Sequence, residues 1–435
     1  MKYYAPLLIS LLIFTACSSE DEIELTLPNE LIVSLDVAAV FNDEEFQIRY
    51  RFETENPSWY HQKWVFQDGE WVRYGSGTPG VDDFGFYEDR ISMQLDDGSV
   101  PFFDVMGGYA TTHTGMRSLA SEASGDEVSE IDYFAENGRS DVRKFIMESR
   151  EGEPDEESWK RVRSDEEIAQ LRQDGVFLDL WQWRAHRSNP IGYADNGYVL
   201  EYRLNSEGTG PYTTNWDSEN NQPQWMFNPE VTGAVALDFE RLKNQGYGQD
   251  DHYFLYEGNA IAFDPDHEWQ EGDVLPQRFL RTPDGSRGAL KADGRYENGA
   301  WNVVITRTLA SPNPLDSKEL TPGETYHVSF AVHSGGVGAR WHHVSMPLTL
   351  SLGEENSNAD IVAVYTDGAL DEAELDWVSL PLFYPGQTTF DWLHNYHPGH
   401  HVVRTGQVSV RDMHKLDELI EYILDIEREM EANYR

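Results

Sequence analysis

Cysteine is almost missing from this chain, because Cys17 is the only one among 435 residues. A single cysteine cannot form an intramolecular disulfide, and a lipid on its thiol would also exclude a thiolate zinc site, a cysteine nucleophile and a thioether link to a cofactor. The fold must therefore be held together by its hydrophobic core. A chain of this length can bury most of its apolar surface, so such a core is sufficient.

Cys17 occupies the position of the acylated cysteine in a bacterial lipoprotein. Met1-Lys2 and a short apolar run precede it, and the acidic stretch Ser18 to Glu22 follows it. A basic start, an apolar run too short to span a bilayer and a small residue before the cut describe a secretory signal peptide. We therefore expect residues 1–16 to be a lipoprotein signal peptide and residues 17–30 an acidic tether. The alternative is an ordinary signal peptide with an incidental cysteine.

The expected location follows from this leader. A lipid on Cys17 would anchor the exported protein to a membrane, and the acidic run after the cysteine resembles the surface-export signal of some bacterial outer-membrane lipoproteins. We expect the protein on the outer membrane, at its periplasmic face or on the cell surface. After the leader, the sequence contains no second apolar run long enough to cross a membrane.

Basic residues are also few, and lysine is the rarest of them. The chain has 33 Lys and Arg, of which eight are Lys, against 77 Asp and Glu, and its formal net charge is −44. Nucleic acid is therefore not an expected partner, because phosphate binding needs clustered Lys and Arg. An acidic, lysine-poor composition is typical of proteins that work in high salt, where screening relieves self-repulsion. It indicates a halophilic source, which the salt dependence of the unfolding free energy would test; an acidic cell-surface protein from an ordinary habitat is the alternative.

Aromatic residues are abundant, with 13 Trp, 22 Tyr and 20 Phe, and Gly, Pro and Asn turns are frequent. This composition and many short alternating segments predict a mainly β fold, an antiparallel β-sandwich of immunoglobulin-like or carbohydrate-module-like type. Asn298-Gly299 predicts a hairpin turn. The expected strands are Leu31 to Val37, Phe46 to Phe52, Tyr198 to Leu204, Trp301 to Arg307, Tyr326 to Val332 and Val344 to Leu352.

Two segments interrupt the strand pattern. Residues 120–175 are acidic and polar and contain the capping box Ser164 to Glu167, so they predict a helical insertion. From Asp412 onward, apolar residues at helical spacing predict an amphipathic C-terminal helix that packs on the domain. The resulting domain prediction is a sandwich over residues 31–355 and a C-terminal extension over residues 356–435.

Sequence motifs of nucleotide binding and of hydrolysis are absent, and the 77 acids are too many for any carboxylate pair to indicate a glycosidase. Histidine and methionine are better indicators of a functional site than the acidic residues, because imidazole and thioether bind haem iron and imidazole also binds zinc or copper. The alternative for each one is a methionine that fills a core gap or a histidine that is only hydrogen-bonded. The candidate ligands are Met106, His113, Met116, His342, His343 and His414.

The chain resembles the haem-binding subunit or domain of ethylbenzene dehydrogenase and of related dimethyl-sulfoxide-reductase-type enzymes. It is most similar to the stand-alone branch of that family, which carries c-type haem. The resemblance covers nearly the whole mature chain and implies the same β-sandwich. The residues that carry it are Glu88-Asp89-Arg90-Ile91, Pro101-Phe102-Phe103 with Met106-Gly107, Asp179 to Ala185, Asn189 to Asp195, Gly299 to Val303 with Arg307 and Leu309, Phe330 to His333, Arg340 to Ser345, Phe383 to Gln387 and His397-Pro398-Gly399.

The chain departs from that branch at its two Cys-X-X-Cys-His motifs. The corresponding segments read Tyr109-Ala110-Thr111-Thr112-His113 and Val410-Arg411-Asp412-Met413-His414, so both histidines remain and all four cysteines are missing. Covalent haem is therefore excluded at both places, and the resemblance implies either a non-covalent haem b or a haem-free descendant. It further implies axial ligation by Met106 and His342, with His113, Met116 and His343 as alternatives.

Two functions are open at this point. The first is a lipid-anchored, extracytoplasmic haem b protein that transfers electrons, with a possible redox partner protein and without catalysis of its own. The second is a haem-free binding module for carbohydrate or another ligand. In that case Trp181, Trp183, Trp216 and Trp225 are the candidates to stack on sugar rings, although most of them are expected to be core residues instead.

Overall fold

The protein is mainly β. The computed structural model describes residues 32–75, 86–117, 122–336, 338, 342–353 and 358–383. No helix among these residues is both long and apolar enough to cross a membrane. The candidates Cys17 and His414, the acidic tether and the expected C-terminal helix lie outside the described residues.

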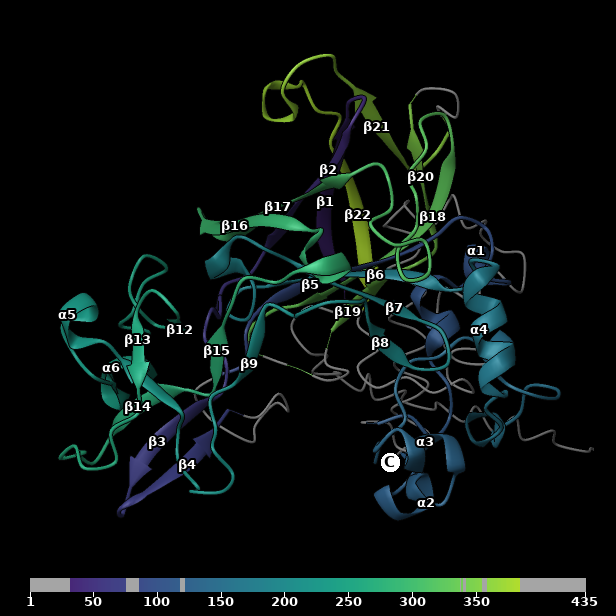
Figure 1. The fold of residues 1–435 in the computed structure, drawn as a ribbon. Helices are drawn as coiled ribbons and strands as arrows, with labels where there is room; N and C mark the ends of the chain where they lie inside the picture. The colour runs from purple at the N-terminus through teal and green to yellow at the C-terminus, as the bar shows by residue number, and fades with distance from the viewer. Residues whose placement is uncertain are drawn as a thin grey trace, which may run out of the picture.

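A 13-stranded sheet forms the main body. It folds into two layers that face each other, as expected of a sandwich (Figure 1). One layer contains β1 (Ile32–Phe41), β2 (Glu45–Glu53), β17 (Ala300–Thr308) and β16 (Lys291–Glu297). The other contains β18 (Thr325–His333), β5 (Arg90–Asp96), β6 (Leu178–Arg184), β7 (Asp195–Val199) and β8 (Arg203–Asn205), all antiparallel to their neighbours.

Four later strands connect the two layers. They are β19 (His343–Ser345), β20 (Leu348–Leu352), β21 (Ile361–Tyr365) and β22 (Val378–Phe383). β20 pairs antiparallel with β18 and parallel with β21, and β21 runs parallel to β1. β22 pairs antiparallel with both β1 and β19. The sheet therefore continues past residue 355, where the sequence prediction ended the sandwich, because these short segments add apolar faces to its core.

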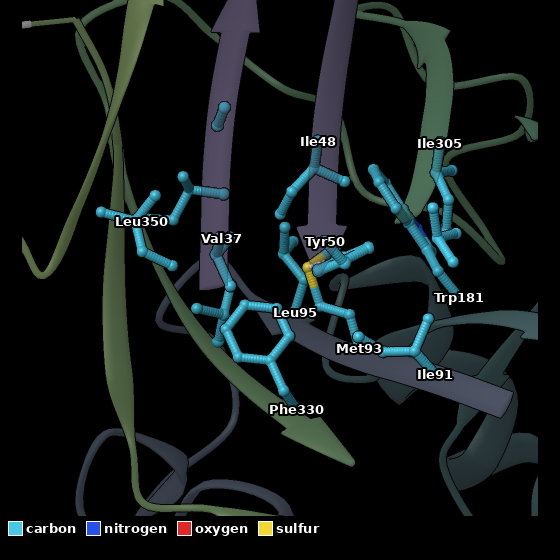
Figure 2. Close-up of a cluster of buried hydrophobic side chains, with 14 of the residues drawn as sticks. Val37, Ile48, Tyr50, Ile91, Met93, Leu95, Trp181, Ile305, Phe330 and Leu350 are labelled. Carbon is cyan, nitrogen blue, oxygen red and sulfur yellow. Dashed lines mark hydrogen bonds between the residues drawn. The ribbon is translucent and has the colours of Figure 1, made fainter. Parts of the chain in front are cut away.

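Successive side chains of each strand point to opposite faces of the sheet, and those that point between the layers form the core. Trp181 and Trp183, both on β6, are almost fully buried in it. Figure 2 shows side chains from β1, β2 and β17 meeting those from β5, β6 and β18: Val37, Ile48, Tyr50 and Ile305 on one side, and Ile91, Met93, Leu95, Trp181 and Phe330 on the other. Trp181 and Trp183 are therefore core residues, which was the expectation for most of the sugar-stacking candidates, and neither ring is available to a sugar.

The predicted hairpin joins β16 to β17. Glu297 pairs with Ala300, so the loop consists of Asn298 and Gly299 alone, with φ values of 54° and 84°. Positive φ at both positions is what a type I′ turn requires, and Asn-Gly meets that demand at low cost.

A second lobe is inserted between strands of the sandwich and was not predicted as a separate unit (lower left in Figure 1). Its own core includes Tyr60, Phe86, Leu255 and Leu275. Its strands are β3 (Lys63–Gln67), β4 (Glu70–Tyr74), β9 (Tyr212–Thr214), β10 (Trp225–Phe227), β11 (Leu237–Asp238), β12 (Leu255–Tyr256), β13 (Ala260–Ala262), β14 (Asp273–Pro276) and β15 (Arg278–Leu280), with helices α5 (Pro229–Thr232) and α6 (Phe239–Lys243).

Lys63 in this lobe makes the stability of the protein depend on pH. The side chain is fully buried, and its Nζ donates to the carbonyl oxygen of Tyr253 at 3.1 Å. Burial lowers the pKa of Lys63 to about 7, although the charge of Glu88 acts against the shift. Between pH 7 and the ordinary lysine pKa, the unfolded chain therefore binds more protons than the folded one, so stability rises with pH.

We expect the free energy of unfolding to rise by a few kcal/mol from pH 7 to pH 10, at about 1.4 kcal/mol for each pKa unit. The Lys63→Met variant should lose most of this rise and should be more stable than the parent at pH 7. Urea unfolding at several pH values measures both effects, with Lys291→Met on the surface as the control. An equal pH slope in the parent and in Lys63→Met would contradict the prediction.

The expected helical insertion consists of short pieces. Its helices are α2 (Gly125–Ser129), α3 (Asp132–Glu136) and α4 (Asp165–Gln173), with 3₁₀ turns at Met147–Ser149 and Ser158–Lys160. The predicted capping box begins α4: the Ser164 hydroxyl accepts the amide of Glu167, whose carboxylate accepts the amide of Ser164. Ahead of the insertion, α1 (Phe103–Met106) runs into the 3₁₀ helix η1 (Gly107–Thr111).

Candidate functional site

A cavity of about 920 Å³ lies on the outer face of β5, β6 and β18, between the sandwich, η1 and the second lobe. Alternate residues of these three strands form its floor, because the residues between them point into the core. The floor residues are Arg90, Ser92 and Gln94 on β5, Leu180, Gln182 and Arg184 on β6, and Ser329, Ala331 and His333 on β18. Strand pairing aligns them in rows: Arg90 lies opposite both Arg184 and His333.

Two glycines let η1 approach this sheet closely. A Cβ on Gly108 would lie 3.0 Å from Ser329 Oγ and 3.1 Å from Gln94 Oε1. Gly107 has a positive φ of 53° and would meet the backbone of Pro347. The Gly107-Gly108 pair therefore fixes one wall of the cavity, and the next turn presents Tyr109 and Thr112 to it.

The lining is strongly basic, although the protein as a whole is strongly acidic. Among the described residues it contains eight arginines and one lysine, Lys144, and no Asp or Glu. The arginines come from separate parts of the chain: Arg73 on β4, Arg90, Arg184, Arg203 and Arg278 on four further strands, and Arg117, Arg143 and Arg187 on loops. Three carboxylates behind the lining pair with some of them. Asp195 contacts Arg184, Asp141 contacts Arg117 and Arg143, and Glu88 contacts Arg187.

Two tyrosine rings hold the guanidinium groups in place. The guanidinium carbons of Arg184, Arg187 and Arg278 lie 5.8, 5.3 and 5.6 Å from the ring centre of Tyr212. Arg90 lies 4.9 Å from the ring centre of Tyr87. These distances are within cation–π range, so the rings order the cations without neutralising them.

The lowered pKa values of these two tyrosines are a consequence of the positive potential in the cavity. Burial by itself raises the pKa of the Tyr87 hydroxyl, but the charges of Arg187 and Arg90 outweigh it and lower that pKa to about 8. The pKa of Tyr212 is lowered in the same way, because Arg187 and Arg184 outweigh its burial. A cavity that favours phenolate will favour other oxyanions for the same reason.

Four arginines of the lining, Arg73, Arg90, Arg203 and Arg278, have no carboxylate partner among the described residues. Arg90 is only 9% exposed, and its Nε and Nη2 have no hydrogen-bond partner within the described part of the chain. The Nε of Arg278 also lacks a hydrogen-bond partner among the described residues. Burial first, and then the neighbouring Arg143 and Arg184, lower the pKa of Arg203 to about 10.

Of the ligand candidates from the sequence, Met116 and His342 line this cavity. His342 stacks on His333, with ring centres 4.4 Å apart. His343 pairs with Val332, whose side chain faces the core, so it does not share the face of His342. One member of the His342-His343 pair therefore faces the cavity, as strand alternation requires.

Met106 and His113 do not line the cavity. Met106 is half-buried at the junction of α1 and η1. His113 is buried with its ring stacked on Phe145, and its Nε2 lies 3.2 Å from the carbonyl oxygen of Phe145. Burial and the nearby Arg150 lower the pKa of His113 to about 3, so its imidazole is neutral. The backbone amide of His113 donates to Met116 Sδ at 3.1 Å and so positions that sulfur.

Sequence reasoning missed the arginines and His333. A partial signal exists on β5, where Arg90, Ser92 and Gln94 alternate with Ile91, Met93 and Leu95, so the strand needs a polar environment on its second face. The other arginines lie on separate segments with no common spacing, and only the folded chain brings them together. No group of three or more His, Cys, Asp or Glu side chains that could hold a metal ion occurs in the described ranges.

Comparisons with known proteins place this geometry in context. The model of a family described as ethylbenzene dehydrogenase matches residues 22–345, which is most of the chain. Cytochrome c-552 of Stutzerimonas stutzeri is 31% identical over 112 residues, a match that covers 24% of this chain and 35% of that protein. The alignment thus spans about a third of the relative's length.

Proposed function

The chain belongs to the ethylbenzene dehydrogenase family, and on that premise we propose that it binds haem non-covalently in the arginine-lined cavity and transfers electrons. It does so as a lipoprotein anchored through Cys17 at the outer membrane, with a redox partner protein and without catalysis of its own. The relative named cytochrome c-552 supports the haem-related part of the proposal.

The observation that carries the proposal is the direction in which Tyr109 and Thr112 face. The resemblance of the sequence to the c-type-haem branch aligns these two residues with the cysteines that hold a covalent haem. Both line the cavity. A haem bound at this place in the relatives would therefore lie in the space that this chain keeps open, without the thioether bonds.

The lining fits a haem in three respects. Its volume of about 920 Å³ lies within the range of about 300–1,000 Å³ that is usual for cofactor and ligand pockets. Met116 and His342 provide a thioether and an imidazole, the pair that ligates iron in cytochromes c. The arginines provide fork-shaped donors for the two propionates. Met116 is the better methionine candidate, because Met106 does not line the cavity.

When bound, a haem supplies one-electron chemistry. The residues of this chain bind and orient the group. His342 is held by its stacking on His333, and the amide of His113 donates to the Met116 sulfur and so positions it toward the cavity. Arg90 and Arg278 line the cavity and would neutralise propionates. The surrounding positive charge would favour the reduced form of a bound redox centre over the oxidised form, because the reduced form carries one more negative charge.

Haemin titration tests the proposal. The purified protein should take up one haemin per chain and show a Soret band that shifts on reduction with dithionite. His342→Ala and Met116→Ala should each change the spectrum and weaken haemin binding by at least tenfold, because each would remove a side chain that would hold the iron. Met106→Ala serves as the matched control and should leave both unchanged.

A colourless protein that takes up no added haemin would overturn the haem proposal. Unchanged spectra in both His342→Ala and Met116→Ala would keep the haem but reject these ligands. Near-UV circular dichroism of each variant shows that the fold is intact.

A further inference from the structure

We propose that the cavity binds a small ligand that carries several negatively charged oxygen groups, such as carboxylates, sulfates or phosphates. This inference goes beyond the proposed haem function and does not rest on it. A haem has two propionates, and the cavity holds more positive charge than two carboxylates can neutralise.

The charge of the lining carries the inference. Nine cationic side chains line the cavity, and the carboxylates that contact them within the described chain are Glu88, Asp141 and Asp195. Asp195 is shared in addition with Arg287, which does not belong to the lining. The excess of positive charge is concentrated in a protein whose net charge is −44. Such a local reversal of sign focuses the field and raises the local concentration of small anions.

Arg90 is the second, independent observation. It is nine-tenths buried on the cavity floor, and its Nε and Nη2 have no hydrogen-bond partner among the residues described. A buried guanidinium without a carboxylate partner is costly, because it has lost hydration and its contact with the Tyr87 ring supplies no hydrogen-bond acceptor. An oxyanion in the cavity supplies both the missing charge and the missing acceptors.

The donor chemistry identifies the ligand class. Guanidinium groups present planar forks that match carboxylate, sulfate and phosphate oxygens in bidentate fashion. Gln62, Gln94 and Gln182 add amide groups to the lining, and Ser92 and Ser329 add hydroxyls. These neutral groups suit a ligand that also carries hydroxyls, so a sugar acid or a sugar sulfate is a fitting form.

The ligand should be small. The cavity is walled by the sheet, η1 and the second lobe, and its volume suits a compact molecule. Around it the acidic exterior repels an extended polyanion, because that polymer would have to lie along the negatively charged surface. A long nucleic-acid or sulfated polysaccharide chain is therefore not the expected occupant.

Isothermal titration calorimetry at low ionic strength tests the proposal with three probes: citrate, pyrophosphate and a disulfated disaccharide. At least one should bind with one molecule per chain, and which one binds identifies the oxyanion. Raising the salt to about 0.5 M should weaken the binding at least tenfold, since screening acts on charge–charge attraction. Failure of all three probes to bind at millimolar concentration would overturn the proposal.

Two substitutions assign the binding to the cavity. Arg90→Met and Arg278→Met should each weaken the binding probe at least tenfold, whereas Arg295→Met should not. Arg295 is the matched control, because it pairs with Asp250 on the surface and does not line the cavity. Unchanged affinity in both cavity variants would overturn the proposal. Thermal unfolding shows whether a variant is still folded. Arg90→Met removes a buried charge without a carboxylate partner, so its melting temperature should equal or exceed that of the parent.

The same titrations with haemin separate the two proposals. Anion binding without haemin uptake would reject only the haem function, and haemin uptake without anion binding would reject only this inference. If both bind and haemin displaces the anion, both proposals hold and share the cavity.

Discussion

Replacing Glu88 with glutamine is expected to lower the free energy of unfolding by about 3–5 kcal/mol. The carboxylate of Glu88 is fully buried where the sandwich meets the second lobe. Its Oε2 accepts the backbone amides of His186 and Arg187, each at 2.7 Å, and its Oε1 accepts the guanidinium Nε of Arg187. Oε1 also lies 3.6 Å from His61 Nδ1.

Every polar neighbour of Glu88 in this set can act as a donor, which is why the neutral amide does not substitute for the carboxylate. Glutamine keeps the shape, but its NH₂ group must point toward one of the donors and leave it unsatisfied. The charge of Arg187, which is only 8% exposed, then also lacks its partner. The loss of a buried counter-charge is the more costly of these two effects.

Urea unfolding of Glu88→Gln at neutral pH measures the change. Glu53→Gln is the matched control, because Glu53 forms only an exposed pair with Arg51 at 3.9 Å, and such pairs contribute about 0–1 kcal/mol. A loss below about 1 kcal/mol in Glu88→Gln would mean that Glu88 does not hold the junction together. The double variant with Arg187→Met should be less destabilised than the sum of its single variants, because they remove the same ion pair.

Replacing Trp183 with alanine is expected to cost about 3–5 kcal/mol. Its ring is fully buried in the sandwich core and packs edge-on against Trp301, with ring centres 5.0 Å apart. Its Nε1 donates to Asn189 Oδ1 at 2.9 Å, and the same oxygen accepts the amide of Gly294. The truncation therefore leaves a large cavity and removes one donor from a junction between β6, β16 and the loop that contains Asn189.

Thermal and urea unfolding of Trp183→Ala test this prediction. Trp216→Ala is the control within the same residue type, because Trp216 is only half-buried in the lobe, where it stacks on Trp64 at 4.0 Å. We expect a clearly smaller loss for Trp216→Ala. Equal losses would contradict the placement of Trp183 in a tightly packed core. Binding of a sugar that depended on Trp183 while stability was unchanged would contradict its burial.

Local rules account for the parts of the fold that were predicted correctly. The Asn298-Gly299 turn follows from the positive φ values that a two-residue hairpin needs, and the Ser164 to Glu167 capping box follows from the free amides at a helix start. Strand alternation predicted a β-sandwich, and it also accounts for the finding that His342 and His343 do not share a face. Each of these rules involves residues a few positions apart, so they can be read along the chain.

The candidate site was predicted only in part. The sequence proposed six ligand candidates and preferred Met106, but in the folded chain Met116 and His342 line the cavity. Met106 and Met116 flank the same η1 turn, and nothing in their spacing says which of them points to the cavity. That choice depends on the Gly107-Gly108 contact with β18 and Pro347, which joins segments more than 200 residues apart.

The sequence by itself therefore determined the class of fold, the local turns and caps and the family resemblance. The tertiary structure alone decided how the sheet closes through β21 and β22, that a second lobe has its own core, and that eight arginines meet in one cavity. The physical reason is the range of the interactions. Turn, cap and alternation act between neighbours in the chain, whereas the positive potential of the cavity is a sum over side chains from distant segments, which exists only once the chain has folded.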